Sequence, residues 1–587
     1  MRRFARLLPF VRPYRVRLVA GFASVVLTVA AQAYVPRAFK FAFDALPGDA
    51  PDVHTAAAWA GVAVLLTALR GVFQYVMRKT LVGVSRELER GLRDRLYASL
   101  LRRSPAWLAR HHTGDVMSRL TADVEAVRMS VGPGLMYVAN TALLAPLAFW
   151  FMWRMSPALT LLNLLPLCGV ALATRLLAPR MHTASVAVQE SQAELSTRAQ
   201  ESFAGVRVVK SFAHEEHEVT SFAERAERSR AANLDLSDAR ALFQPVIGFM
   251  KGGALVLTLL VGGRMMAQGT LGLGDFLAFN LYAAMLMWPM ISLGWVISLW
   301  QRGRAAMDRL ATLLDEEPEI RDAPDALAPA TVRGELEVRA LTFRYDGAPT
   351  PALEDVSFRV PAGHTLAVVG PTGAGKSTLL ALLPRILATP AGCVFLDGEP
   401  VERLRLDTLR RAMGFVPQDT FLFSDTIREN VAFGFDDSRE NAANLEPRVR
   451  DALAKARVAD EIDALPQGLD SLLGERGVNL SGGQRQRTAI ARALAADPPI
   501  LLLDDCLSAV DARTEAEILA NLREVLAGRT TVLVTHRVAA ARLADEILVL
   551  DGGRVVARGT HAALLAEDGL YARLAQRQSL EERLEAA

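Results

Sequence analysis

Long uncharged stretches in the amino-terminal half constrain this chain more than any other feature. Residues 18–36, 129–153, 155–174 and 276–301 contain no Lys, Arg, Asp or Glu. Two more apolar stretches, 55–77 and 241–263, contain only Arg70 and Lys251 as charged residues. About 20 apolar residues in a helix cross the hydrocarbon core of a bilayer. The sequence therefore predicts six membrane-spanning helices near these ranges, within an all-α domain of residues 1–316.

The distribution of basic residues predicts how these helices are oriented. With a cytosolic amino terminus, residues 1–17, 78–128 and 175–240 face the cytosol and carry 26 Lys and Arg residues, whereas the outer loops carry 4. Basic residues accumulate on the cytoplasmic side of membrane proteins. We therefore expect a multi-pass protein of the cytoplasmic membrane with both termini in the cytosol.

The two long cytosolic segments, 78–128 and 175–240, are polar and helical in composition. We expect them to continue the spans as helical extensions that project from the bilayer. Their candidate tips are residues 113–123 and 205–215. Solvated connecting helices without a mechanical role have the same pattern, so the pattern alone leaves both interpretations open.

Composition excludes several classes of function. Lys and Arg number 66 and Asp and Glu 64, and the resulting net charge of +2 does not favour nucleic acid as a partner. The three cysteines, Cys168, Cys393 and Cys506, are far apart, which indicates neither a disulfide framework nor a zinc site. A mean hydropathy of +0.21 is typical of a chain that lies partly in lipid.

A linker and a second domain follow the predicted spans. Residues 317–331 are rich in Pro, Ala and Asp, and beyond them short Val- and Leu-rich strands alternate with helices. This alternation predicts an α/β domain over residues 332–587.

A glycine-rich loop in this domain lies between a predicted strand, 360–369, and a predicted helix, 379–387. It matches the P-loop pattern G-x-x-x-x-G-K-[ST] in the required context. Glycines let backbone N–H groups surround phosphate oxygens, the Lys reaches the terminal phosphates and the Ser hydroxyl reaches Mg²⁺. The predicted ATP-binding residues of the loop are Gly370, Pro371, Thr372, Gly373, Ala374, Gly375, Lys376, Ser377 and Thr378.

Two further motifs point to the same chemistry. The apolar strand 500–503 ends in Asp504, where a carboxylate at the edge of a parallel sheet can hold Mg²⁺. A second phosphate-binding loop opens the predicted helix 488–496. It consists of Leu480, Ser481, Gly482, Gly483 and Gln484. One chain can hardly bring both loops to one nucleotide, whereas a head-to-tail pair of domains can, so we expect the second loop to serve the ATP of a partner.

With L-S-G-G-Q between Walker A and Walker B motifs, the second domain resembles the ATP-binding cassette family. The six spans ahead of it make the whole chain similar to a multidrug-type ABC exporter half-transporter. The resemblance implies a six-helix transmembrane domain with cytosolic helical extensions, followed by a P-loop NTPase cassette. It also implies a swapped dimer in a lipid bilayer, with the two tips as coupling helices. ATP and Mg²⁺ are the implied cofactors, and alternating access driven by ATP binding is the implied mechanism.

The same resemblance assigns roles to residues outside these loops. Tyr345 is similar to the aromatic platform for adenine, and Gln418 to the Q-loop residue that contacts Mg²⁺ and senses the extensions. His536 corresponds to the switch histidine at the γ-phosphate. Glu475 and Asp511 match two coupling loops, the exporter-specific loop and the D-loop.

One position departs from the family pattern. Where most cassettes have Glu after the Walker B Asp, this chain has Asp505. The carboxylate there orients the attacking water, and misplacement by about 1 Å can cost about 100-fold in rate. We therefore expect a hydrolytically weak site in this chain and an intact signature that serves a second half-transporter, as in heterodimeric exporters. The alternatives are a homodimer in which Asp505 acts as the catalytic base, and an ATP-binding regulator or channel that pumps nothing.

The substrate is the least constrained expectation. The resemblance implies an amphipathic small molecule or a lipid. Arg70 and Lys251 lie within spans, where a charge is costly, so each is a candidate to pair with an anionic substrate group or with another charge of the protein.

Overall fold

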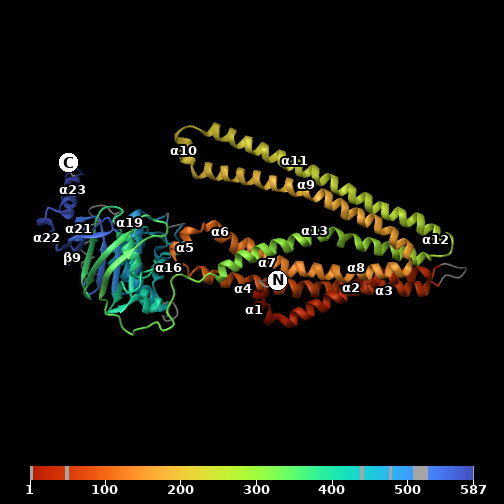
Figure 1. Cartoon of the computed structure of the whole chain (residues 1–587), viewed down its shortest axis with the longest axis horizontal. Helices are drawn as coiled ribbons and strands as arrows, with labels where there is room; N and C mark the ends of the chain where they lie inside the picture. The colour runs from red at the N-terminus through yellow and green to blue at the C-terminus, as the bar shows by residue number, and fades with distance from the viewer. Residues whose placement is uncertain are drawn as a thin grey trace. The chain divides into compact units, whose positions relative to one another are not determined.

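The computed structural model describes residues 4–46, 52–435, 442–474, 477, 479–506 and 526–585 (Figure 1). The chain forms two compact units. One consists of Met1–Leu100 and Thr113–Glu316, and the other of Leu101–His112 and Glu317–Ala587.

Every secondary-structure element among the described residues of the first unit is a helix. Its longer elements are α2 (Arg15–Asp44), α3 (Val53–Met77), α4 (Gly83–Leu100), α8 (Leu135–Met155), α9 (Pro157–Ala204), α11 (Glu215–Leu257) and α13 (Leu273–Asp315). The shorter helices are α1 (Leu8–Val11), α6 (Thr113–Ser118), α7 (Val124–Met129), α10 (Val206–Ser211) and α12 (Gly263–Ala267). Short π-helical segments join α3 to α4, α6 to α7, α7 to α8 and α11 to α12.

Six helical segments among the described residues are long and apolar enough to cross a membrane, which confirms the predicted number of spans. They are Leu8–Asp44, Val53–Leu100, Thr113–Met155, Pro157–Ala204, Glu215–Ala267 and Leu273–Asp315. Each continues well beyond its uncharged stretch. A 48-residue helix such as α9 is about 72 Å long, more than twice the hydrocarbon core of a bilayer.

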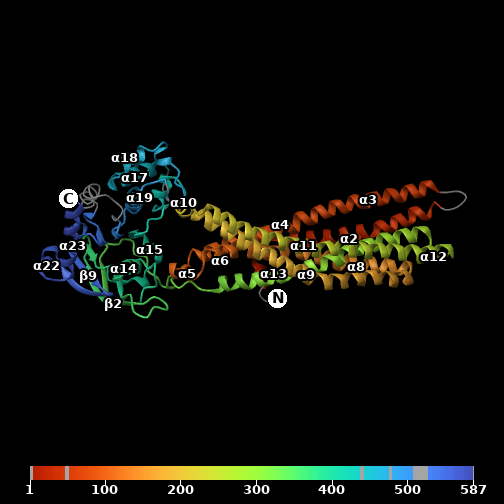
Figure 2. The same ribbon diagram turned by 90° about the horizontal axis from the view of Figure 1, so that it is seen from above.

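Helices α9 and α11 pair along their length (Figures 1 and 2). Glu218 of α11 accepts hydrogen bonds from Arg198 and Ser202 of α9, at 2.5 and 2.6 Å. The connection between the two helices is α10, within the predicted tip 205–215.

The other predicted tip, 113–123, is misplaced. These residues form α6 and the π-helical segment after it. Both lie at the start of the helical segment Thr113–Met155, beyond the turn. The turn lies earlier, at 101–112, and contains α5 (Pro105–Arg110). Ser104 caps α5 by accepting a hydrogen bond from Trp107 N–H, and Pro105 occupies its first turn. This Ser-Pro helix start marks the true turn in the sequence.

A buried ionic cluster joins α4 to α7. The Glu89 carboxylate, only 4% exposed, lies 2.9 Å from Arg86, 2.8 Å from Arg93 and 3.3 Å from Arg128. Arg128 is also 4% exposed and pairs with Glu125. Charges this far from water are stable only while they remain paired.

The second unit is an α/β domain with two sheets. The first sheet has the order β2-β1-β4-β5, with β1 (Leu336–Phe343), β2 (Leu353–Val360), β4 (Val394–Leu396) and β5 (Glu399–Pro400). The second has the order β10-β9-β3-β8-β7-β6, with β3 (Thr365–Val369), β6 (Met413–Val416), β7 (Ile500–Asp504), β8 (Thr530–Val534), β9 (Glu546–Asp551) and β10 (Arg554–Gly559). All its strand pairs are parallel except β10 with β9.

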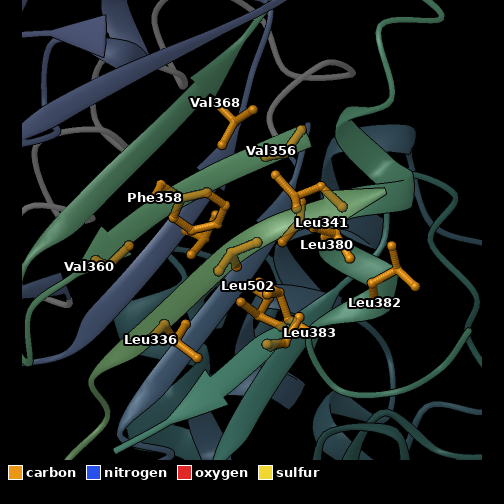
Figure 3. Packing of buried hydrophobic residues seen from close by; sticks show 14 of the residues in the cluster. Leu336, Leu341, Val356, Phe358, Val360, Val368, Leu380, Leu382, Leu383 and Leu502 are labelled. Atoms are coloured by element: carbon orange, nitrogen blue, oxygen red, sulfur yellow. The ribbon is translucent and has the colours of Figure 1, made fainter. Parts of the chain in front are cut away.

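The helices of the second unit that follow β3 lie between its strands or, for α22 and α23, after the last strand. They are α14 (Lys376–Leu382), α15 (Leu406–Arg411), α16 (Ile427–Ala432), α17 (Ala442–Lys455), α18 (Ala459–Asp463), α19 (Gly482–Ala495), α21 (Val538–Ala541), α22 (His561–Ala566) and α23 (Leu570–Glu585). One apolar core lies between the two sheets and α14 (Figure 3). There Leu341 and Phe358 of the first sheet face Val368 and Leu502 of the second and Leu380 of α14.

The linker belongs to the second unit and pairs with another part of it. Leu327 exchanges backbone hydrogen bonds with Arg403 and Arg405, at 2.7 and 2.9 Å. The turn 101–112 belongs to this unit as well: Ser104 donates to the Glu319 carboxylate at 2.7 Å, and Arg110 pairs with Asp346 at 3.0 Å.

Removal of the Glu89 carboxylate is expected to destabilise the helical unit strongly. Glu89→Ala leaves buried Arg128 with one carboxylate fewer, which costs about 3 kcal/mol. Thermal unfolding of the detergent-solubilised protein measures the effect. Asp94→Ala, which breaks the exposed pair of Arg90 and Asp94 on the same helix, is the control and is expected to cost less than about 1 kcal/mol. Equal melting temperatures for the two variants would contradict the role assigned to the cluster.

Candidate functional site

The carboxyl ends of β3, β7 and β8 border a cleft of about 740 Å³ in the second unit. The structure brings most of the sequence-predicted site residues together in its wall. These are Tyr345, Gly370, Pro371, Thr372, Gly373, Gly375, Lys376, Ser377, Thr378, Gln418, Asp504, Asp505 and His536. Ala374 belongs to the same loop but is buried and does not line the cleft.

The loop between β3 and α14 has the backbone conformation that its glycines permit. Gly373 and Gly375 have φ values of +85° and +94°, which side chains disfavour. A Cβ at Gly370 would lie 2.1 Å from the carbonyl oxygen of Leu550, so the loop also packs too closely on β9 for any larger residue. Lys376 Nζ donates to the carbonyl oxygens of Gly370 and Pro371, both at 2.8 Å. These two hydrogen bonds from Lys376 stabilise the curved backbone of the P-loop.

Asp504 ends β7 at the floor of the cleft and is 4% exposed. Burial raises the pKa of its carboxyl group, and the hydrogen bond from Ser377 opposes that rise. Its Oδ1 atom has no hydrogen-bond partner among the described residues. An unpaired buried carboxylate oxygen beside a serine hydroxyl and a glutamine amide fits Mg²⁺, which proteins hold through one or two carboxylates together with substrate phosphates.

Asp505 and His536 contact each other directly. His536 Nδ1 lies 2.7 Å from Asp505 Oδ1, and Asp505 N–H donates to the Val534 carbonyl oxygen at 2.9 Å. Asp505 has a φ of +45°, an unfavourable conformation for a residue with a side chain. The bond to Asp505 raises the pKa of His536, while its partial burial and the charge of Lys376 lower it. The two side chains therefore form a hydrogen-bonded pair in the wall of the cleft.

Tyr345 also lines the cleft. Its hydroxyl lies 3.0 Å from Thr378 Oγ1, and its ring meets Phe343 edge to face at 5.0 Å. Tyr345 is 41% exposed, so part of its surface is open to a planar ligand in the cleft.

The second phosphate-binding loop, residues 480–484, does not line this cleft. Ser481 and Gln484 form a capping box at the start of α19: Ser481 Oγ accepts from Gln484 N–H at 3.2 Å, and Gln484 Oε1 accepts from Ser481 N–H at 2.8 Å. Leu480 is buried and Ser481 is exposed. The loop is preorganised by its own hydrogen bonds, with Gly482 and Gly483 in the first turn of the helix.

Two predicted coupling residues, Glu475 and Asp511, lie outside the described residues.

Sequence reasoning missed part of the cleft wall. Leu574, Arg577 and Gln578 of α23 line it as well. Tyr571, Leu574 and Gln578 follow at helical spacing and share one helix face. This spacing was the only sequence pattern that could have indicated that the helix packs on the domain. Arg110 of the turn 101–112 was also missed, and its partner Asp346 is the chain neighbour of Tyr345.

Comparisons with known proteins agree along the whole chain. Residues 18–290 match the family described as the ABC transporter transmembrane region, and residues 353–508 match the family described as ABC transporter. The chain is 34% identical over 572 residues to the "Probable multidrug resistance ABC transporter ATP-binding/permease protein YheI" of Bacillus subtilis (strain 168), covering 97% of each. It is 35% identical over 597 residues to the "ATP-dependent lipid A-core flippase" of Aromatoleum aromaticum, covering 99% of this chain and 97% of that protein.

A solved structure has the same fold. It is described as "Structure of a bacterial Atm1-family ABC exporter with ATP bound" and aligns with a TM-score of 0.79 at 31% identity. The alignment covers 96% of this chain and 98% of that one.

Neutralising Asp505 is expected to lower the pKa of His536. Asp505→Asn keeps the size of the side chain but removes the charge that stabilises the imidazolium. Mass spectrometry of exchange at the imidazole C2 hydrogen measures this pKa. Asp419→Asn, an exposed change beside Gln418, is the control. An equal shift in both variants would contradict a specific pair.

The pair also predicts a direction for the pH dependence of stability. Because the folded-state pKa of His536 is raised, its stabilising effect is fully present below the ordinary value of 6.5 and is lost as the pH rises through the raised value. The difference in thermal stability between wild type and Asp505→Asn is therefore expected to shrink toward high pH.

Proposed function

The chain is an ABC half-transporter in which a transmembrane domain is fused to an ABC ATPase domain, and on that basis we propose that it exports an amphipathic small molecule or lipid. Export is driven by ATP through alternating access, with both termini in the cytosol. The chain works as one subunit of a dimer, and we favour a heterodimer with a second half-transporter.

One observation carries the dimer: the cleft contains one phosphate-binding loop, and the other loop, residues 480–484, is absent from its wall. Both loops are preformed. A nucleotide held by the P-loop of one subunit and the signature of the other would join the two cassettes. The nucleotide binds the closed pair of cassettes more tightly than the open pair, and this difference in binding free energy moves the helices.

The exposed tip of the α9–α11 pair supports an exchanged contact between subunits. Phe212 is 72% exposed and Val208 is 61% exposed, an unusual arrangement for apolar side chains at the end of a polar helix pair. The second unit offers a groove of about 800 Å³ bordered by the exposed ring of Phe433 and by Phe435. We propose that α10 of each subunit docks in this groove of the other.

Within its own site, each residue of this chain has a defined task. Tyr345 stacks on the adenine, the P-loop amides and Lys376 hold the phosphates, and Ser377, Gln418 and Asp504 hold Mg²⁺. The metal, when bound with ATP, neutralises phosphate charge. Asp505 and His536 face the terminal phosphate.

Asp505 is the reason to propose a weak hydrolytic site. Its side chain is one methylene shorter than Glu, and its Oδ1 atom is already engaged by His536 at 2.7 Å. A carboxylate that is both shorter and engaged in this way orients an attacking water poorly. We therefore assign most of the turnover to the site that combines the partner's Walker motifs with this chain's signature.

The same contact favours the homodimer as a second candidate. Although the Asp505 side chain is one methylene shorter than that of Glu, it contacts His536 directly. An acid–histidine pair of this kind can act as a general base in ATP hydrolysis. A regulator or channel that binds ATP without pumping has no specific support from the site.

The membrane unit supports an amphipathic substrate. Trp288 is 63% exposed on α13, and Trp295 of the same helix is 42% exposed and meets Tyr137 edge to face at 5.1 Å. Lys251 is exposed on α11, and Nε of Arg70 on α3 is buried without a hydrogen-bond partner among the described residues. Both cations remain candidates for an anionic substrate group. The names of the relatives, a multidrug transporter and a lipid A-core flippase, point to the same class of substrate.

Transport itself is tested in inside-out vesicles that contain the assembled dimer. ATP-dependent accumulation of a fluorescent amphipathic anion or a labelled lipid is expected, and it should stop when Lys376 of this chain and the P-loop lysine of the second subunit are both changed to Met. ATP binding without accumulation of any probe would favour the regulator.

The identity of residue 505 is expected to set the turnover of the chain on its own. The purified chain should hydrolyse ATP slowly, and Asp505→Glu should accelerate it by about 10- to 100-fold by restoring the reach of the carboxylate. Phosphate release in lipid nanodiscs is the measurement. Rapid turnover of the wild-type chain alone, abolished by Asp505→Ala, would establish the homodimer instead.

Two matched substitutions separate the roles of the loops in the heterodimer. Ser481→Arg blocks the signature that completes the partner's site and is expected to reduce turnover by about 100-fold or more. Lys376→Met weakens only this chain's own site and is expected to have a much smaller effect. In a homodimer the two substitutions would be equally damaging.

A further inference from the structure

The carboxy-terminal helix α23 forms part of the ATP cleft, although no nucleotide-binding motif lies in it. We propose that Gln578 of α23 is a positioning residue that fixes the backbone on both sides of Arg537 and thereby directs His536 into the cleft.

Gln578 makes two hydrogen bonds across this turn. Its Oε1 atom accepts from Val538 N–H at 2.7 Å, and its Nε2 donates to the carbonyl oxygen of His536 at 3.0 Å. A carboxamide is suited to this position because it carries a donor and an acceptor on one rigid group. The two bonds bridge the peptide groups that flank Arg537.

The turn has one local side-chain contact, in which Arg537 N–H donates to Thr535 Oγ1 at 3.0 Å, but the start of α21 has no side-chain cap of its own. Val538 is the first residue of α21, where backbone N–H groups have no partner within the helix. Arg537 occupies the capping position, and its side chain makes no capping hydrogen bond. Gln578 thus supplies from a distant helix the acceptor that a Ser or Asp would supply locally.

Helix α23 is held in place by buried contacts and can therefore fix the position of the turn. Tyr571 is 1% exposed and packs in one cluster with Val369 of β3, Val549 of β9 and Leu564 of α22. Its hydroxyl lies 2.7 Å from Nδ1 of His561. Tyr571, Leu574 and Gln578 follow at helical spacing on one face. The position of Gln578 is therefore tied to β3, the strand that leads into the P-loop.

The consequence for His536 is geometric. Its imidazole reaches Asp505 at 2.7 Å from a backbone that Gln578 holds, and small misplacements of reacting groups cost large factors in rate. This consequence rests on the role proposed above for His536 at the terminal phosphate, whereas the anchoring of the turn does not.

Hydrogen exchange tests the anchoring directly. Gln578→Met keeps the length of the side chain and removes both hydrogen bonds. In the full chain in nanodiscs, the amide of Val538 is expected to exchange about tenfold faster, as the loss of its acceptor implies. Gln576→Met, an exposed change on the same helix, is the matched control and should leave this exchange unchanged. Unchanged exchange at Val538 in Gln578→Met would overturn the proposal.

A second variant guards against misfolding. Gln578→Glu keeps an acceptor for Val538 N–H but loses the donor to the His536 carbonyl oxygen. The amide of Val538 should therefore stay protected, whereas the amide of Arg537, which shares a peptide group with that carbonyl, should exchange faster than in wild type. If Gln578→Met fails to fold, wild-type exchange at both amides flanking Arg537 in Gln578→Glu would overturn the proposal.

Turnover tests the positioning. In an assembly in which His536→Ala impairs hydrolysis, Gln578→Met should lower kcat about tenfold and leave KM for ATP unchanged, because Tyr345 and the P-loop are intact. Faster exchange without any loss of kcat would refute a positioning role. In the proposed heterodimer this chain's own site contributes little turnover, so where His536→Ala has no effect on turnover, the exchange result alone decides whether Gln578 holds the turn.

Discussion

Parallel pairing of β3, β8 and β7 is the constraint on which the site depends. In a parallel sheet the carboxyl ends of neighbouring strands meet at one edge, and here that edge carries the P-loop, His536 and Asp504. The strands are buried along their whole length, so their register is fixed by packing. Residues more than 160 positions apart in the chain are thereby brought around one cleft.

The motif residues were predictable because their chemistry is local. A glycine at φ +94°, a lysine that closes a loop and a carboxylate at a strand end each follow from a few neighbouring residues. The six spans were predictable for a similar reason, since an uncharged stretch of about 20 residues has few alternatives to a membrane helix.

What the sequence did not reveal depends on contacts between distant segments. The turn was predicted too late in the chain because Thr113 and Gly114 are residue types common in loops. In the structure these two residues begin α6, and the turn lies at 101–112. The contact of Asp505 with His536 and the two bonds of Gln578 join segments far apart in the chain. No local pattern specifies them, so only the folded domain shows that α23 belongs to the site.

The exposed aromatic tip of the α9–α11 pair has a consequence for biogenesis. A subunit that has not found its partner carries Phe212 and Val208 in contact with water. Exposed apolar surfaces of this kind promote aggregation, and chaperones and proteases of the cell recognise them. In the heterodimer proposed above, orphan copies are then removed while paired copies persist, so the cell can keep the two subunits in balance without matching their synthesis.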